Sequence, residues 1–221
     1  MRGRNGISWA VVAGVALVLC GVAFAEVVGK ATAPLDARGV REAECALGSL
    51  VADAMKSSLG AELALLQASQ LRPALIPAGE VTREALTGAL LYPDEKVVVG
   101  EVSGAQIKAA LERSLSMAPK PSTSFLQVSG LTVTFRSEAP PEQRVVEARV
   151  GGAPLSAEKT YRVAMPASLA KGALGYFRIF NGLQPKKTGP AIGEAVVEYV
   201  LAARTVAPQG GRIRDLSRPA G

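Results

Sequence analysis

The chain has 221 residues, of which 48% are apolar and 20% charged, a balance typical of a globular protein with a sizeable core and not of a disordered chain. Its net charge of +6 is spread along the sequence without a cluster of Lys and Arg, so we expect no nucleic-acid partner. The sequence contains no histidine, which excludes Ser-His-Asp triads, Cys-His dyads and His-ligated metal centres within it.

The first 25 residues have the pattern of an export signal. A positive start at Arg2 and Arg4 precedes apolar and small residues over 7–24, and an A-x-A cleavage site occupies residues 23–25. We therefore expect residues 1–25 to be removed and the protein to be periplasmic or secreted. The alternative is an uncleaved membrane anchor, because about 18 apolar residues can just span a bilayer. The membrane is an expected partner only in that case.

Behind the leader, residues 26–40 read as a linker that contains a proline and two glycines. An amphipathic helix is expected over 42–59, because apolar residues recur there every three or four positions up to Gly60. The short apolar run 62–67 predicts a strand, and Thr82 is a suitable N-cap for a brief helix that ends near residue 90.

The second half of the chain continues the alternation of strands and helices. A β-branched strand is expected over 96–102, and Ser103 with Gln106 forms a capping box for a helix that ends near residue 115. Three further strands are expected over 131–136, 144–150 and 161–165, followed by a helix over 192–203. This order indicates an α+β domain with a mixed sheet and interleaved helices over residues 41–213, with 214–221 as a tail.

Four residues near the predicted first helix have structural interpretations. After cleavage Cys45 is the remaining cysteine, so we expect no internal disulfide and a small buried side chain on the helix. Glu42 and Glu44 lie at the start of the helix, where carboxylates suit its dipole, and we do not interpret them as a catalytic pair. Asp53 is expected to be a structural hydrogen-bonding residue.

Several stretches, in the same order, resemble the C-terminal domain of the 5'-nucleotidase family. They are 47–55 (LGSLVADAM), 102–108 (VSGAQIK), 125–131 (FLQVSGL), 154–155 (PL) with 159–164 (KTYRVA), 172–176 (GALGY) and 211–213 (GRI). The resemblance implies that catalysis in the family belongs to a separate N-terminal metallophosphatase domain with two metal ions, held by His, Asp and Asn. It implies that the C-terminal domain grips the nucleoside end of the substrate and rotates to deliver it. We therefore expect this chain to be a stand-alone recognition domain without catalytic residues, metal or cofactor.

The resemblance also implies where a nucleoside would bind. The family's Asn-x-Gly-Gly-x-Arg loop aligns with residues 67–72, where Arg72 is unchanged and Gln67 keeps an amide, but side chains replace both glycines. Tyr92 aligns with the first of two aromatic residues that sandwich the base. Ser168 aligns with the second aromatic residue and has no ring, and Leu174 replaces an acidic hydrogen-bond acceptor.

The expected ligand-binding residues are Gln67, Arg72, Tyr92 and Tyr176. Each has an alternative structural role: Arg72 as a solvated or structural cation, Tyr92 in half-buried packing, and Tyr176 in preserving the backbone turn that begins at Gly172. Three functions stay open. The domain is a non-enzymatic module for a nucleoside-like small molecule, a recognition subunit that docks on a separate metallophosphatase, or a structural envelope domain whose pocket is lost.

Overall fold

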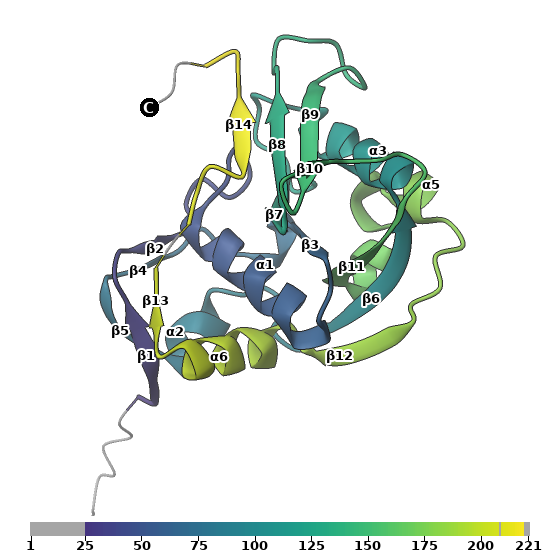
Figure 1. The fold of residues 1–221 in the computed structure, drawn as a ribbon. Coiled ribbons are helices and arrows are strands. Elements are labelled where there is room, and N and C mark those ends of the chain that lie inside the picture. Colours follow the sequence, from purple (N-terminus) through teal and green to yellow (C-terminus); the bar gives the residue numbers. More distant parts are fainter. Residues whose placement is uncertain (1–24, 208, 219–221) are drawn as a thin grey trace, which may run out of the picture.

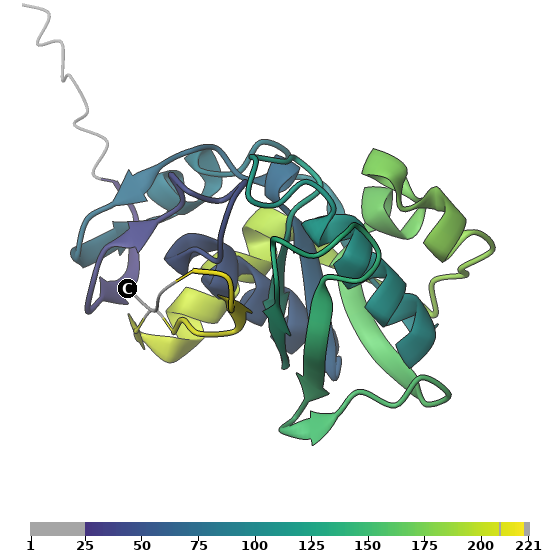
Figure 2. The same cartoon turned by 90° about the horizontal axis from the view of Figure 1, so that it is seen from above.

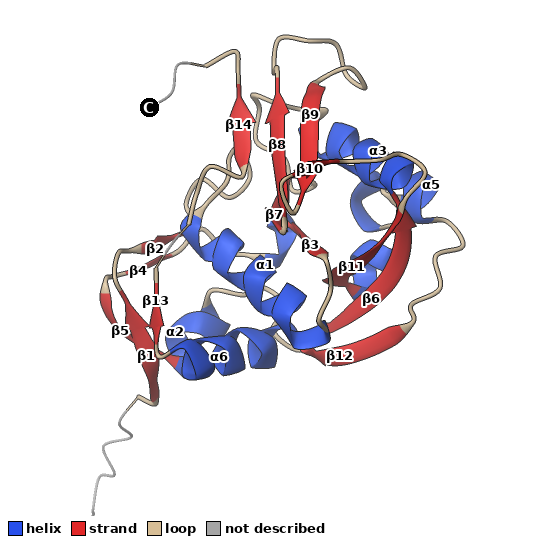
Figure 3. Ribbon diagram, in the orientation of Figure 1, coloured by secondary structure: helices blue, strands red, loops and turns tan. Residues whose placement is uncertain are grey.

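The computed structural model describes residues 25–207 and 209–218. A mixed five-stranded sheet lies at the centre of the domain (Figure 1), and Figure 3 separates its strands from the helices that cover it. In spatial order its strands are β12 (Lys187–Ala191), β6 (Lys96–Ser103), β11 (Thr160–Pro166), β3 (Leu63–Gln67) and β7 (Leu126–Ser129). β3 and β11 are parallel, and the other neighbouring pairs are antiparallel. The expected α+β fold with a mixed sheet is therefore confirmed.

The central strands follow from continuous apolar runs. All five residues of β3 are buried, as expected for a strand that is covered on both faces. The β-branched run at the start of β6 is also buried at Val97, Val98 and Val99. Both strands were predicted from the sequence to within one residue.

Helices cover both faces of the sheet (Figure 2). α1 (Ala46–Leu59) and α6 (Ile192–Ala203) pack together on one face, whereas α3 (Gly104–Leu115) packs on β6 and on α5 (Phe177–Phe180). The short helices are α2 (Arg83–Gly88), α4 (Ala167–Ala170) and the 3-10 turns η1 (Ala68–Gln70) and η2 (Ala173–Gly175). The predicted caps are present: Thr82 accepts from the Ala85 amide, and both hydrogen bonds of the capping box at Ser103 are formed.

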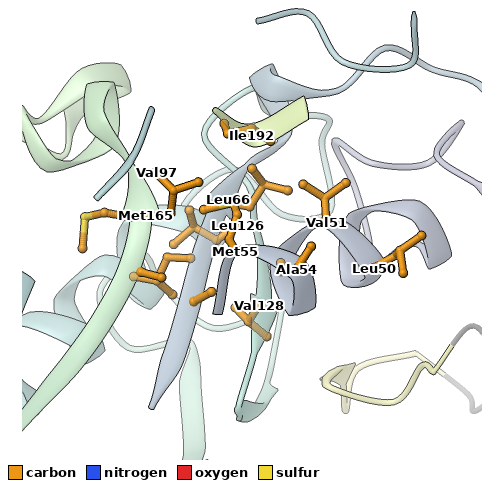
Figure 4. Close-up of a cluster of buried hydrophobic side chains, with 14 of the residues drawn as sticks. Leu50, Val51, Ala54, Met55, Leu66, Val97, Leu126, Val128, Met165 and Ile192 are labelled. Atoms are coloured by element: carbon orange, nitrogen blue, oxygen red, sulfur yellow. The ribbon is translucent and has the colours of Figure 1, made fainter. Parts of the chain in front are cut away.

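The core fills the space between α1 and the sheet. Figure 4 shows side chains from α1 that meet side chains from the central strands and from the start of α6. The labelled members of this cluster are Leu50, Val51, Ala54, Met55, Leu66, Val97, Leu126, Val128, Met165 and Ile192.

Three smaller sheets surround the central one. β1 (Val27–Ala31) lies between β13 (Thr205–Val206) and β5 (Gly79–Thr82), and β2 (Leu35–Asp36) pairs with β4 (Leu75–Ile76). The third sheet has the spatial order β10 (Ala153–Pro154), β9 (Val145–Val150), β8 (Leu131–Phe135) and β14 (Ile213–Asp215).

Two expected boundaries differ from the structure. Residues 26–40 are not a linker, because β1 and β2 lie within them and the side chains of Leu35 and Val40 are buried. The expected tail begins inside β14, which pairs in parallel with β8. The sequence of both segments shows no clear strand pattern, because the strands with which they pair come from distant parts of the chain.

The first helix begins later than expected. It starts at Ala46, and Cys45 is its N-cap, whose sulfur accepts from the Gly48 amide. The thiol is half-buried, and burial raises the pKa of Cys45 to about 11. Residues 1–24 of the expected export signal lie outside the described residues. Within the described residues, no helix combines the length and the apolar character that a membrane crossing requires.

Candidate functional site

The fold brings three distant segments to one edge of the central sheet. β3 and β11 are parallel, so their carboxyl ends, which lead into residues 67–72 and 167–176, share this edge. β6 is antiparallel to β11, with Pro166 opposite Val97, so the start of β6 and the preceding Tyr92 come to the same edge. The convergence is a consequence of strand direction.

A carboxylate that sequence reasoning missed joins two of these segments. One oxygen of Glu95 accepts from Gln70 Nε2 at 2.6 Å, and the other accepts from the Ser168 amide at 2.6 Å. Hydrogen bonds to a charged acceptor are the stronger kind, so Glu95 holds η1 against the start of α4. No pattern in the sequence marks Glu95, because it stands in an ordinary polar turn before β6.

Gln67 and Gln70 lie beneath the surface of this region. Both side chains are buried, and each Oε1 has no hydrogen-bond partner among the described residues. A buried acceptor without a partner costs about 1–3 kcal/mol. Gln67 is thus placed at the site but is covered, whereas Gln70 is used to bind Glu95.

Arg72 and Tyr92 are on the surface, in two segments that are joined by backbone hydrogen bonds. The Arg72 amide donates to the Ala89 carbonyl at 2.9 Å, and the Leu91 amide donates to the Gln70 carbonyl at 2.8 Å. Arg72 is exposed, and the Tyr92 side chain is 58% exposed. These two predicted site residues are therefore accessible to a ligand.

Tyr176 has a different position from the one expected of a ligand-binding residue. It is completely buried, its ring stacks on Phe180 at 6.0 Å, and its hydroxyl donates to the Ser124 carbonyl at 2.5 Å. Burial raises the pKa of Tyr176. The structure supports its alternative role, in which it holds the turn. Phe177, which sequence reasoning missed, is 59% exposed directly after it.

The turn before Tyr176 depends on residues with left-handed backbone. Gly172 has φ 87°, and an added Cβ would lie 2.2 Å from the Phe177 Cα, so glycine is required there. Leu174 adopts φ 58°, and its carbonyl accepts from Arg113 Nη2 at 2.7 Å. Ser168 and Leu174 supply neither an aromatic face nor a carboxylate at the positions where the resemblance implies them.

Two acidic residues near the first helix, Asp53 and Glu44, have structural partners. Asp53 binds Arg212 at 2.8 Å and accepts from the Ser129 hydroxyl, as expected of a structural residue. Glu44 accepts from the backbone amides of Arg212 and Ile213. In the described ranges, no three Asp, Glu, Cys or His side chains gather in a way that could hold a metal ion.

Comparisons with known proteins match this architecture. Residues 27–182 match the family described as "5'-nucleotidase, C-terminal domain". The chain belongs to this family. It is 31% identical over 210 residues to a 5'-nucleotidase-related protein of Glossina morsitans morsitans, with 85% of this chain and 38% of the relative covered. It is 29% identical to an apyrase of Anopheles gambiae, with 82% of this chain and 33% of the relative covered.

Solved structures agree with the family assignment. The crystal structure of a 5'-nucleotidase precursor from Thermus thermophilus is 32% identical, with a TM-score of 0.80, and the match covers 88% of this chain and 40% of that one. An NAD nucleotidase from Haemophilus influenzae shares the fold at 17% identity, with a TM-score of 0.73 and 86% and 38% coverage. The chain thus spans about two fifths of the length of these 5'-nucleotidase relatives or less.

Proposed function

We propose that this 5'-nucleotidase C-terminal domain is a non-catalytic recognition module that binds a nucleoside-like small molecule weakly. The observation that carries the proposal is the convergence of residues 67–72, Tyr92 and the 168–176 turn at one sheet edge, with Glu95 joining two of them. The exposed Arg72 and Tyr92 stand at this edge, and the resemblance to the family implies a binding role at both positions.

The expected affinity is low. Tyr92 offers one stacking face, which contributes about 1–3 kcal/mol per base in single-stranded nucleic-acid binders, and Ser168 offers no second face. Leu174 cannot accept a hydrogen bond from a sugar or base, and such a loss costs about 1–3 kcal/mol. Together these losses weaken binding by about two orders of magnitude, to roughly millimolar.

Isothermal titration with adenosine and AMP tests the binding site. We expect roughly millimolar dissociation constants for the wild type. Arg72→Ala and Tyr92→Ala should weaken binding severalfold, whereas Arg214→Ala, at an exposed position on β14, should leave it unchanged. Micromolar binding that neither Arg72→Ala nor Tyr92→Ala affects would refute both the location of the binding site and the predicted low affinity.

We assign no hydrolysis to this chain. The sequence has no histidine from which a two-metal centre of the kind implied for the family could be built. We expect no turnover of AMP or of a chromogenic phosphate ester, with or without Mn²⁺ or Zn²⁺. Metal-dependent turnover that disappears when carboxylates of this chain are substituted would contradict this expectation.

A second candidate function is that of a recognition subunit for a separately encoded metallophosphatase. Two large aromatic side chains, Tyr92 and Phe177, are more than half exposed on segments adjoining the site. Size-exclusion chromatography of this chain with an isolated metallophosphatase from the same organism would test the association. Co-elution that Tyr92→Ala and Phe177→Ala abolish together supports this function, and separate elution at micromolar concentrations counts against it.

We also propose that residues 1–25 direct export and are removed. A new chain start at Glu26 would coincide with a residue that is held to the folded domain. The Glu26 carboxylate binds Arg83 at 2.5 Å, and the Glu26 carbonyl accepts from the Arg83 amide. The intact mass and N-terminal sequence of protein recovered from the periplasm or medium should begin at Glu26. Full-length protein in the membrane fraction would instead identify the uncleaved anchor.

A further inference from the structure

A further cleft shares only Gly175 of its lining residues with the three segments of the nucleoside-binding proposal. It has a volume of about 710 Å³ and lies between α3, α5 and the loop that joins β8 to β9. Figure 1 and Figure 2 both show α3 and α5 side by side. Small-molecule sites in proteins have volumes of about 300–1,000 Å³. The cleft therefore has the size of a site for a metabolite.

The walls of the cleft are fixed in place by hydrogen bonds. The buried carboxylate of Glu112 accepts from the Arg144 amide at 3.0 Å and from the Val145 amide at 2.9 Å, which ties the loop to α3. Gln106 Nε2 donates to the Ile179 carbonyl at 2.9 Å, which ties α5 to the other end of α3. The cleft is thus formed before any ligand binds.

Arg113 is a half-buried cation in this wall. Its Nη2 donates to the Leu174 carbonyl at 2.7 Å, its Nη1 donates to Ser116 Oγ at 3.0 Å, and its guanidinium lies 6.0 Å from the centre of the Tyr176 ring. All these partners are neutral, and none of the described carboxylates lies within ion-pair distance of it. The neighbouring Glu112 is already used by backbone amides. A guanidinium has five N–H donors, so Arg113 retains donors beyond those two bonds.

Glycine permits this placement of Arg113. An added Cβ at Gly175 would lie 2.7 Å from Arg113 Nε, so any side chain there would displace the guanidinium. Gly175 also has φ 86°, where glycine is favoured.

The rest of the lining combines small or apolar residues with exposed cations. The small or apolar lining residues are Ala105, Ala109, Pro141 and Ala157, which are exposed, and Ile179, which is half-buried. Lys108 and Arg178 are exposed and form no ion pair with any described residue. The acidic lining residues are Glu142, which is exposed, and Glu112, which is buried. An apolar body with an anionic end matches this lining in both respects.

A second cleft, of about 990 Å³ along α1, provides a contrast. It is lined by Arg212, Lys56 and Arg149, but Arg212 is paired with Asp53, Arg149 is paired with Glu147, and Lys56 lies in the last turn of α1, where the helix dipole favours a cation. Arg113 also lies in the last turn of its helix, α3, so the contrast rests on the other two cations. Arg212 and Arg149 are ion-paired, whereas Arg113 has no ion-pair partner among the described residues.

We propose that the cleft between α3 and α5 binds a small amphipathic anion, with its carboxylate, sulfonate or phosphate group on Arg113 and its apolar body against Ala105, Ala109 and Ile179. Lys108 and Arg178 attract the anion and exclude cations. Because Arg113 also holds the Leu174 carbonyl, a ligand that binds its guanidinium is sensed by the 172–176 turn.

The probe for this site is 8-anilinonaphthalene-1-sulfonate, and its uncharged relative N-phenyl-1-naphthylamine is the control for apolar binding alone. We expect the sulfonate to bind at least tenfold more tightly than the neutral compound. Arg113→Ala should weaken sulfonate binding by about tenfold or more, since a hydrogen bond to a charged group is lost. Lys108→Ala and Arg178→Ala should each weaken it by up to about fivefold, as exposed charges do. Lys56→Ala, in the second cleft, is the matched control and should have no effect.

The location and the role of Arg113 are tested separately. In amide NMR spectra, the sulfonate should shift the resonances of residues 174–176 and leave those of 151–152 and 210–211 unchanged. If Arg113→Ala disturbs folding, two other variants should still weaken binding. Arg113→Lys keeps the charge but loses the paired N–H donors of the guanidinium, and the Lys108→Ala/Arg178→Ala double variant removes the two exposed cations. The proposal is overturned if the neutral compound binds as tightly as the sulfonate, or if Lys56→Ala weakens sulfonate binding as much as Arg113→Ala does. Resonance shifts confined to the residues of the second cleft would also overturn it.

Discussion

Arg212 should be among the residues on which the stability of the fold depends most. It lies in the segment between β13 and β14, and its guanidinium binds both oxygens of Asp53, at 2.8 and 3.0 Å, and the Val128 carbonyl at 2.9 Å. Its side chain is 13% exposed, and those of Asp53 and Glu44 are 23% and 9% exposed. Arg212→Ala would leave these two carboxylates in the protein without their cation.

The size of the effect follows from this burial. Breaking a buried ion pair from one side typically costs about 3–5 kcal/mol, and the partial exposure of Asp53 lets water offset some of that cost. We therefore expect a loss of about 2–4 kcal/mol. For a domain of this length, a loss of about 3 kcal/mol lowers the melting temperature by about 6–12 °C.

Urea denaturation followed by circular dichroism measures this loss. Arg214→Ala, two residues away and exposed, is the matched control and should change the free energy of unfolding by less than about 0.5 kcal/mol. In the Arg212→Ala/Asp53→Ala double variant, the two losses should not add, because the second substitution removes a carboxylate already left without its partner. An Arg212→Ala variant as stable as Arg214→Ala would refute the reasoning.

Two further predictions concern close packing and pH. In Gly104→Ala the new Cβ would lie 1.9 Å from the Ser156 carbonyl oxygen, so thermal denaturation should show a loss of about 1–3 kcal/mol, whereas Gly39→Ala, with nothing within 4 Å, should be nearly neutral. Hydrogen bonds from Arg38 lower the pKa of Asp36 to about 2. The pKa of an unfolded aspartate is about 3.9, so the stabilisation from Asp36 should be present above about pH 4 and lost as the pH falls through about 2. An NMR titration of Arg38→Ala should return this pKa toward its ordinary value, and an unchanged pKa would contradict the assignment.

Local signals in the sequence determined the main helices and central strands. Thr82, Gly60 and the pair Ser103 and Gln106 mark helix ends through hydrogen bonds and backbone angles that involve residues only a few positions away. The apolar runs of β3 and β6 were recognisable for a similar reason, because strands buried on both faces need a continuous apolar sequence. The ordered motifs of the 5'-nucleotidase C-terminal domain family were equally readable from the sequence.

Only the tertiary structure decided which residues are accessible at the candidate site and where the folded unit begins. Lys30 of β1 pairs with Thr205, far along the chain, so no local pattern in residues 26–40 could reveal the strand. Tyr176 is buried rather than exposed because its hydroxyl reaches the Ser124 carbonyl across the fold. Glu95 acquires its role only where strand direction brings η1 and α4 to the same edge. Such contacts depend on chain segments that are remote in sequence, and hydrophobic periodicity carries no information about which remote segments will meet.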